Sequence, residues 1–375
     1  MNPLWVDAPS VISATSLSKQ LLRVYIYAAE GRNTSYYEDE VHRQLYRRML
    51  QYATNDWKSA NVFFIPTWHI LSYSSFQTHP AFLNSKMRNH FLLHVHTDAA
   101  LCFLRYKNLL SSHLLSRVVF LEYGGRFCHQ NPFCNYHFQR EECYDEGKTI
   151  VIPAVVPLHM NRYYKSRLLR NAFMAMDMDY EQAVSYFQHE RAYVVKYLEM
   201  FRLQISRQIS NYTFLMKFIE RTPGKYNTIL GAHMPGFGVW SARLYAYILA
   251  GVVPVLFTDG VILPFERVIN YEAFSIKIKM TRVITHDYSP FLQMQHLELR
   301  RYHNSFDNTY KDWFDKAILS TQEVAPWLDW RSSDAIRNPF SLIVLEIMCR
   351  IHRHMHEMCQ RSTFRIANRE FWPRD

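Results

Sequence analysis

Short apolar runs alternate with amphipathic segments over residues 22–155 of the chain. The segments between the runs, such as 40–52 and 97–110, repeat their apolar residues with the period of a helix. Strands that are separated by helices form parallel sheets, because each parallel connection must cross back over the sheet. The pattern therefore predicts a parallel sheet with strands at 23–27, 62–66, 90–94, 118–122 and 149–153.

The same alternation returns in the second half of the chain, after a long helical stretch at 180–209. The expected elements are a strand at 226–231, a helix at 241–250, a strand at 253–257, a short helix at 266–271, a strand at 274–279 and a final helix at 339–359. A chain of 375 residues exceeds what one hydrophobic core normally serves. The pattern therefore predicts an α/β fold in two domains.

The helix expected at 241–250 carries an unusual cation. Ser241 can cap this helix and Gly251 can end it, but Arg243 stands in its first turn. A cation there opposes the positive end of the helix dipole by about 0.3–1 kcal/mol, and a bound diphosphate would reverse that cost. Either an anion occupies this helix end, or Arg243 lies on the surface or pairs with Asp259.

Composition narrows the classes of partner. Hydrophobic residues make up 49% of the chain and charged residues 20%, a balance typical of a globular protein. The net charge of +10 fits an anionic nucleotide or an acidic glycan. The cations are scattered and form no recognised nucleic-acid-binding motif, so no nucleic-acid partner is expected.

The six cysteines and two glycosylation sequons bear on the compartment. No Cys-x-x-Cys pair occurs, which argues against a structural zinc site. Cys128, Cys134 and Cys143 fall in one loop-like region, where a disulfide would order the chain. Sequons at Asn33 and Asn211 also fit a secretory lumen.

Three segments, in order along the chain, carry a family resemblance. The first comprises residues 23–27 and 56–68, and the second comprises residues 146–157. The third is a Ser-x-Arg helix that is followed by a Pro-Val strand and an Asp-x-x-x-Leu-Pro-Phe loop. The last segment contains Ser241, Arg243, Pro254, Val255, Asp259, Leu263, Pro264 and Phe265. Together these segments resemble the exostosin-type glycosyltransferases, glycosyltransferase family forty-seven.

The resemblance implies the GT-B architecture, an α/β fold in which two Rossmann-like domains face a central cleft. On this basis the chain divides into an N-terminal extension (1–21), an acceptor-side domain (22–158), a helical connection (159–210), a nucleotide-sugar-binding domain (211–332) and a C-terminal helix with a basic tail (333–375). In such sheets ligands bind beyond the carboxyl ends of the strands. Asp259, which follows the strand expected at 253–257, is therefore expected at the cleft.

The resemblance also implies an activity, namely an inverting glycosyltransferase of hexosyl, pentosyl or glucuronosyl type. Its co-substrate would be a nucleotide sugar, UDP-linked, with no cofactor and no metal ion. The acceptor would be an oligo- or polysaccharide of the cell wall or of a proteoglycan, made in the Golgi lumen, with a partner glycosyltransferase as a further partner. The family usually carries one membrane anchor, and no segment of this sequence is long and apolar enough to be one.

The candidate donor-binding residues surround the Ser-x-Arg helix. Gly236 would let the backbone approach a phosphate, while Ser241 and Arg243 would shape and hold the diphosphate. Asp259 or Glu266 would bind donor hydroxyls. His233, beside the phosphate loop, is a further candidate for a donor contact or for the base.

The candidate catalytic base lies in the His-Val-His-Thr-Asp segment after the strand expected at 90–94. His96 or Asp98 would take the proton of the acceptor hydroxyl, with His94 beside them. The alternative is that these are strand-end polar residues with ordinary structural hydrogen bonds.

Two departures from the family pattern keep a second function open. Ala246 stands where an acidic residue is common, and Pro235 stands where an arginine is common. Both losses would remove donor contacts. The alternative is therefore a non-catalytic exostosin-like GT-B protein that binds glycan or supports a partner transferase.

Overall fold

The structure is a computed structural model. It describes residues 8–27, 36–66, 79–84, 89–94, 118–126, 144–145, 147–156, 230–233, 242–249, 251, 253–256, 260–278 and 308–351. The expected helices at 97–110 and 180–209 lie outside these residues.

A five-stranded parallel sheet forms the first half of the molecule, in the order β1-β2-β3-β4-β6. Its strands are β1 (Val24–Ile26), β2 (Val62–Ile65), β3 (His90–His94), β4 (Val118–Glu122) and β6 (Thr149–Val151). The mixed α/β class and all five strands predicted here are confirmed. Three strands end one or two residues earlier than predicted.

A three-stranded parallel sheet, in the order β10-β8-β7, forms in the second half. Its strands are β7 (Leu230–His233), β8 (Val253–Leu256) and β10 (Ile276–Lys277). The helix α10 (Ala242–Leu249) connects β7 to β8 and is followed by Gly251 at φ 66°, in the left-handed conformation that glycine favours. The predicted helix and its glycine stop are thus confirmed.

The short helix predicted at 266–271 is wrong. Phe265 stands at φ 51°, outside the right-handed helical region, and its carbonyl accepts hydrogen bonds from the amides of both Val268 and Ile269. The chain forms turns there, followed by a single 3-10 turn, η4 (Tyr271–Ala273). Ser275 donates to the carbonyl of Tyr271, so the strand predicted at 274–279 is reduced to the two residues of β10.

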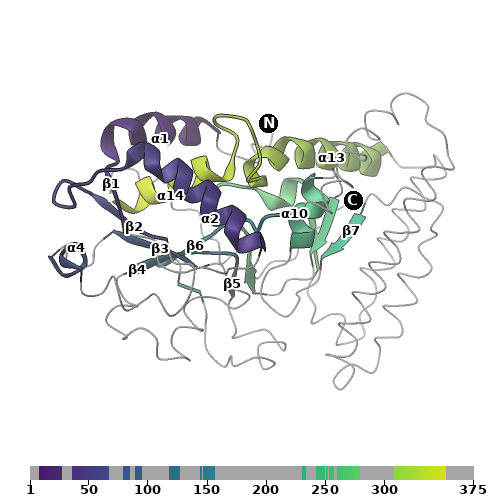
Figure 1. Ribbon diagram of the computed structural model, residues 1–375. Coiled ribbons are helices and arrows are strands. Elements are labelled where there is room, and N and C mark those ends of the chain that lie inside the picture. Colours follow the sequence, from purple (N-terminus) through teal and green to yellow (C-terminus); the bar gives the residue numbers. More distant parts are fainter. Residues whose placement is uncertain are drawn as a thin grey trace, which may run out of the picture.

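Helices pack against both sheets. Figure 1 shows α1 (Ala8–Leu21), α2 (Tyr36–Met49) and α14 (Pro339–Ile351) along one side of the large sheet, and α10 with α13 (Asn308–Leu328) near β7. A 3-10 turn, η1 (Leu50–Tyr52), extends α2, and the short α4 (Pro80–Asn84) precedes β3. The helix predicted at 40–52 is confirmed by α2 and η1. The helix predicted at 339–359 is confirmed up to residue 351, and its remaining residues lie outside the described ones.

One hydrophobic cluster continues from the large sheet into the small one. It includes Phe64 and Leu121 of the large sheet, Leu256 of the small sheet, Ile248 of α10 and Trp327 of α13, all with an exposure near zero. A continuous core holds the two sheets in a fixed relation, because separating them would expose these side chains to water.

Backbone contacts also join the turn after β8 to the large sheet. The strand β5 (Gly125–Arg126), which follows β4, pairs antiparallel with β9 (Val261–Ile262). A few residues on, the amide of Phe265 donates to the carbonyl of Val151 at 3.2 Å. The signature Leu-Pro-Phe turn is therefore docked directly against the edge strand β6.

The return of the chain from α13 to α14 lies beside the segment that leaves β6. The indole nitrogen of Trp330 donates to the carbonyl of Pro153 at 2.7 Å, and Arg331 donates to the carbonyl of Val156 at 2.8 Å. From α14, Arg350 donates to the carbonyl of Thr149 at 3.0 Å. These hydrogen bonds connect the α13–α14 region to β6 and to the segment that follows it.

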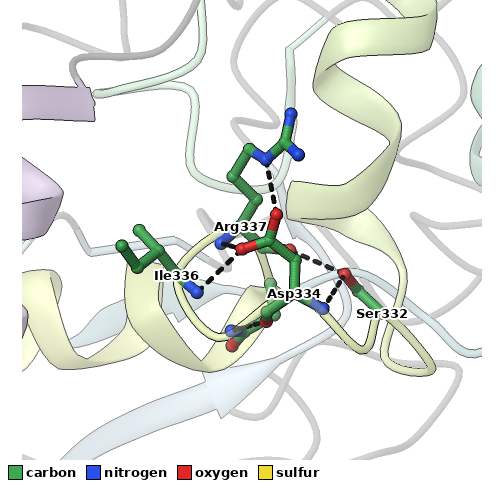
Figure 2. A network of polar contacts seen from close by, with 5 residues as sticks. Ser332, Asp334, Ile336 and Arg337 are labelled. Atoms are coloured by element: carbon green, nitrogen blue, oxygen red, sulfur yellow. Dashed lines mark hydrogen bonds and ion pairs between the residues drawn. The ribbon is translucent and has the colours of Figure 1, made fainter.

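A local network gives the link between α13 and α14 its shape (Figure 2). The carboxylate of Asp334 accepts hydrogen bonds from the amides of Ile336 and Arg337 and from the Arg337 side chain, while Ser332 bridges to the carbonyl of Arg337. The backbone hydrogen bonds lower the pKa of Asp334 to about 2. These hydrogen bonds define the conformation of the link.

Cys349 of α14 is disulfide-bonded. Among the residues that the structure describes, no helix combines the length and the apolar character needed to cross a membrane.

Candidate functional site

Polar side chains gather at the carboxyl edge of the small sheet. His233 is the last residue of β7 and Lys277 the last of β10, and both are register partners of Leu256, the last residue of β8. The three residues therefore form one row across the sheet and share a face. His233 and Lys277 are only 3% and 2% exposed. In an open parallel sheet this edge is where ligands bind.

Glu266 belongs to the turn that follows β9. Its Oε2 accepts a hydrogen bond of 2.7 Å from the amide of Leu263, which closes the Leu-Pro-Phe turn. The side chain is buried, and Oε1 has no hydrogen-bond partner among the described residues. Tyr271 also contacts this turn, because its hydroxyl donates a hydrogen bond to the carbonyl of Pro264 at 2.9 Å.

Burial sets the ionisation of this group. Loss of water raises the pKa of Glu266 to about 8, while the positive charge of Lys277 and the hydrogen bond from Leu263 act in the opposite direction. The pKa of Tyr271 is raised well above its usual value by burial, by Tyr245 and by Glu266. A buried carboxyl group with a raised pKa and a buried lysine whose charge acts on it therefore belong to this part of the molecule.

The helix α10 starts at the same edge, because it follows the carboxyl end of β7. Ala242 and Arg243 begin its first turn, and the backbone amides of that turn can donate hydrogen bonds to an anion. Ala246 is 6% exposed and belongs to the hydrophobic cluster. Of the other predicted donor-site residues, Gly236, Ser241 and Asp259 lie outside the described residues.

The carboxyl edge of the large sheet holds a second acidic group. Glu122 ends β4 and is 1% exposed, and its register partners are His94 at the end of β3 and Val151 of β6. The carbonyl of Val151 is the one that accepts from Phe265, so Glu122 lies one strand away from the docked turn. The predicted bases, His96 and Asp98, follow β3 outside the described residues.

Reasoning from the sequence alone missed two of these residues, Lys277 and Glu122. Lys277 interrupts the apolar strand Phe-Ser-Ile-Lys-Ile, and Glu122 ends the apolar run Val-Val-Phe-Leu. A charged residue within or at the end of a buried run is the signal that could have found both. In the structure, Lys277 and His233 lie at the end of strands of the small sheet, and Glu266 lies in the turn after β9. Glu122 lies in the large sheet.

Residues 230–287 match the family model of the exostosin GT47 domain. The match covers β7, α10, β8 and the turn that contains Glu266, so it includes the polar edge described above. The resemblance expected from the sequence is confirmed over this part of the chain. A domain of this family indicates glycosyltransferase activity in general, with a nucleotide sugar as donor and a glycan as acceptor. No curated protein sequence matches the chain.

Proposed function

From the exostosin GT47 match at residues 230–287, we propose that the protein is an inverting glycosyltransferase that uses a UDP-linked sugar and a glycan acceptor. The observation that carries this proposal is the coincidence of the matched segment with the polar carboxyl edge of the small sheet. That edge provides a helix N-terminus and two buried titratable side chains, His233 and Lys277.

The proposed reaction is a single displacement. The acceptor hydroxyl oxygen attacks the anomeric carbon of the donor, and the bond from that carbon to the diphosphate oxygen breaks with its electron pair. The configuration inverts because attack and departure occur on opposite faces. The negative charge that develops on the leaving diphosphate must be stabilised by fixed donors, which is the largest contribution that such a site can make.

The donor half of the site is assigned to the matched segment. Arg243 and the first amides of α10 hold the diphosphate, with Ser241 and Gly236 shaping the loop before the helix. Asp259 or Glu266 binds hydroxyl groups of the donor, and His233 supplies a further contact. Of these, Glu266 already uses one carboxylate oxygen for the amide of Leu263, which leaves Oε1 for a ligand.

The acceptor half is assigned to the large sheet, and the two sheets form the walls of the GT-B cleft. His96 or Asp98 receives the proton of the acceptor hydroxyl. The docking of the Leu-Pro-Phe turn on β6 supports this arrangement, because it keeps the donor edge next to the end of the large sheet. A fixed geometry of this kind orients the two reactants without a large loss of entropy during the reaction.

The Golgi lumen is the proposed compartment, since proteins of this family typically reside there. The disulfide of Cys349 supports passage through an oxidising compartment, because such bonds are rare in the cytosol.

One observation favours the second candidate function, a non-catalytic protein that binds glycan or supports a partner transferase. Ala246 lies inside the hydrophobic cluster, on the helix that would contact the donor. An acidic residue at this position could accept a charge-assisted hydrogen bond from a donor hydroxyl, a contact worth about 1.5–3 kcal/mol. A partner subunit has no need for this contact or for nucleotide binding.

Calorimetric titration with UDP separates the two functions. The wild type is compared with Arg243→Ala and with Arg43→Ala, a matched loss of one cation on α2, beside the large sheet. We expect micromolar binding by the wild type and by Arg43→Ala, and a loss of at least about tenfold in affinity for Arg243→Ala. Absence of UDP binding by the wild type at millimolar concentration would overturn the enzymatic proposal and favour the second candidate.

A further inference from the structure

We propose that Glu346 of α14 is a positioning residue of the donor site. It holds Arg267 and Arg350 in place and thereby keeps the Leu-Pro-Phe turn docked on β6. The inference rests on the proposed function, because the site that it positions is the one assigned to the nucleotide donor. It adds a residue from outside the segment that matches the exostosin GT47 domain.

The first argument is the outer edge of β6, the last strand in the order of the large sheet. The carbonyl groups of Thr149, Val151 and Pro153 lie along this edge and its continuation, whereas the amide of Ile152 between them donates to β4. Unpaired groups at a sheet edge need partners from elsewhere in the fold. Their donors are, in the same order, Arg350 at 3.0 Å, the amide of Phe265 at 3.2 Å and the indole of Trp330 at 2.7 Å. The signature turn is thus held between a donor from α14 and one from the α13–α14 link.

The second argument is that two arginines share the carboxylate of Glu346. Arg350, one turn further along α14, donates from Nη1 to this carboxylate and from Nη2 to the carbonyl of Thr149 in β6. In addition, Nη1 of Arg267 lies 3.8 Å from Oε2 of Glu346. Arg267 belongs to the turn that follows β9 and comes directly after Glu266. Glu346 therefore connects the signature turn to the edge of β6 through two guanidinium groups.

These three charged side chains are largely buried. Their exposed fractions are 7% for Glu346 and 12% for each of Arg267 and Arg350. Charged groups are costly to bury, and apolar side chains would join the same elements at a lower cost. Ion pairs of arginine depend on direction as well as distance, because the guanidinium group is planar. We therefore expect the network to fix how the turn is oriented on β6.

The orientation of the turn matters for the donor because Glu266 directly precedes Arg267. Glu266 is buried, its Oε2 accepts from the amide of Leu263 at 2.7 Å, and its Oε1 has no hydrogen-bond partner among the described residues. A movement of Arg267 would displace this carboxyl group, and a displaced group loses much of its effect on a bound reactant. Loss of Glu346 should therefore weaken UDP binding without removing a group that touches the ligand.

The experiment is calorimetric titration with UDP, well below the temperature at which any of the proteins unfolds in a thermal scan. The variants are Glu346→Gln, Arg267→Gln and the two combined, which form a double-mutant cycle. Arg267→Lys keeps the positive charge and is the conservative variant. Glu40→Gln is the matched control, because it removes a carboxylate from an ion pair of 2.8 Å with Arg43 on α2. The thermal scans separate a loss of stability from a loss of affinity.

We expect Glu346→Gln and Arg267→Gln each to bind UDP about fivefold or more weakly than the wild type, and the combination no more weakly than either. Arg267→Lys should keep most of the affinity, and Glu40→Gln should bind UDP as the wild type does.

If Glu346→Gln folds and binds UDP as tightly as the wild type, or if the two losses add in the combination, this inference is wrong and the proposed function stands. If Glu346→Gln does not fold, equal UDP affinities of Arg267→Gln and the wild type would overturn the inference in the same way. If the wild type binds no UDP, both are wrong.

Discussion

The two sheets differ in how they treat buried polar side chains. In and beside the large sheet, two tyrosine–histidine hydrogen bonds lie among aromatic rings, while Glu122 is a buried carboxyl group at its carboxyl edge. The hydroxyl of Tyr27 lies 2.9 Å from His90, and that of Tyr25 lies 3.2 Å from His79. Phe63 stacks on His90 with ring centroids 4.6 Å apart. Burial, with a smaller contribution from Tyr25, raises the pKa of the Tyr27 hydroxyl. Hydrogen-bonded pairs of this kind help to fix the packing.

At the small sheet the buried groups are of opposite charge type, with Lys277 at the end of β10 and Glu266 in the turn that follows β9. Burying a charged group is costly, so the retention of these two groups is poorly explained by stability alone. The comparison indicates that the tyrosine–histidine pairs of the large sheet serve packing, whereas buried acidic and basic groups are kept at the carboxyl edges, with both charge types at the small sheet. Three predictions test this difference.

The largest expected effect is on the large sheet. Phe64 of β2 is fully buried in the continuous cluster, and Phe64→Ala should lower the free energy of unfolding by about 3–5 kcal/mol. Urea unfolding measures this change. Leu83→Ala on α4, where the side chain is 58% exposed, is the control and should change the value by about 0.5 kcal/mol or less. Similar values for the two variants would contradict the assignment of the core.

A second effect concerns pH and the small sheet. Because the pKa of Glu266 is raised from 4.5 to about 8, the folded state keeps a proton that the unfolded state has released. The associated stability is fully present below about pH 4.5 and is lost as the pH rises through 8. Glu266→Gln should therefore gain stability relative to the wild type over this range, by up to about 1.4 kcal/mol per pH unit.

Urea unfolding of both proteins at several pH values between about 5 and 8 tests this prediction. Glu323→Gln, which removes an exposed carboxylate from α13, serves as the control. If the curves of wild type and Glu266→Gln run parallel, Glu266 does not titrate in this range. The contrast between the two sheets would then lose its electrostatic basis.

The smallest effect concerns the junction between the sheets. Trp330 donates to the carbonyl of Pro153, whereas the indole nitrogen of Trp327 has no hydrogen-bond partner among the described residues. Both rings are buried, so replacement by Phe removes the same volume. Trp330→Phe should therefore cost about 1 kcal/mol more than Trp327→Phe in thermal or urea unfolding. Equal costs would show that the hydrogen bond to Pro153 does not stabilise the junction.

Much of the fold could be predicted from the sequence, because the strands of a parallel sheet are continuous apolar runs. The boundaries of β3 and β4 agree with the prediction at both ends. The segment after Pro264 could not be predicted, since its helical period conflicts with the left-handed conformation of Phe265 and with docking on Val151. Both are tertiary effects that no local pattern contains.

Only those residues of the candidate site that belong to the family signature could be predicted from the sequence. The signature identifies Arg243 and the turn, but the register that aligns Lys277 with Leu256 and His233 depends on strand pairing. Pairing between strands far apart in sequence cannot be read from either strand alone. For the same reason the position of Glu122 beside Val151 had no sequence signal beyond its place at the end of an apolar run.

The most direct test of the central claim is hydrogen–deuterium exchange of the protein with and without UDP, with uridine as a control. The claim is that a nucleotide diphosphate binds at the carboxyl edge of the small sheet. It predicts that UDP slows exchange in peptides covering β7, the first turn of α10 and residues 257–278, while peptides of β1 and β2 are unchanged. Protection confined to the large sheet, or equal protection by uridine, would contradict it.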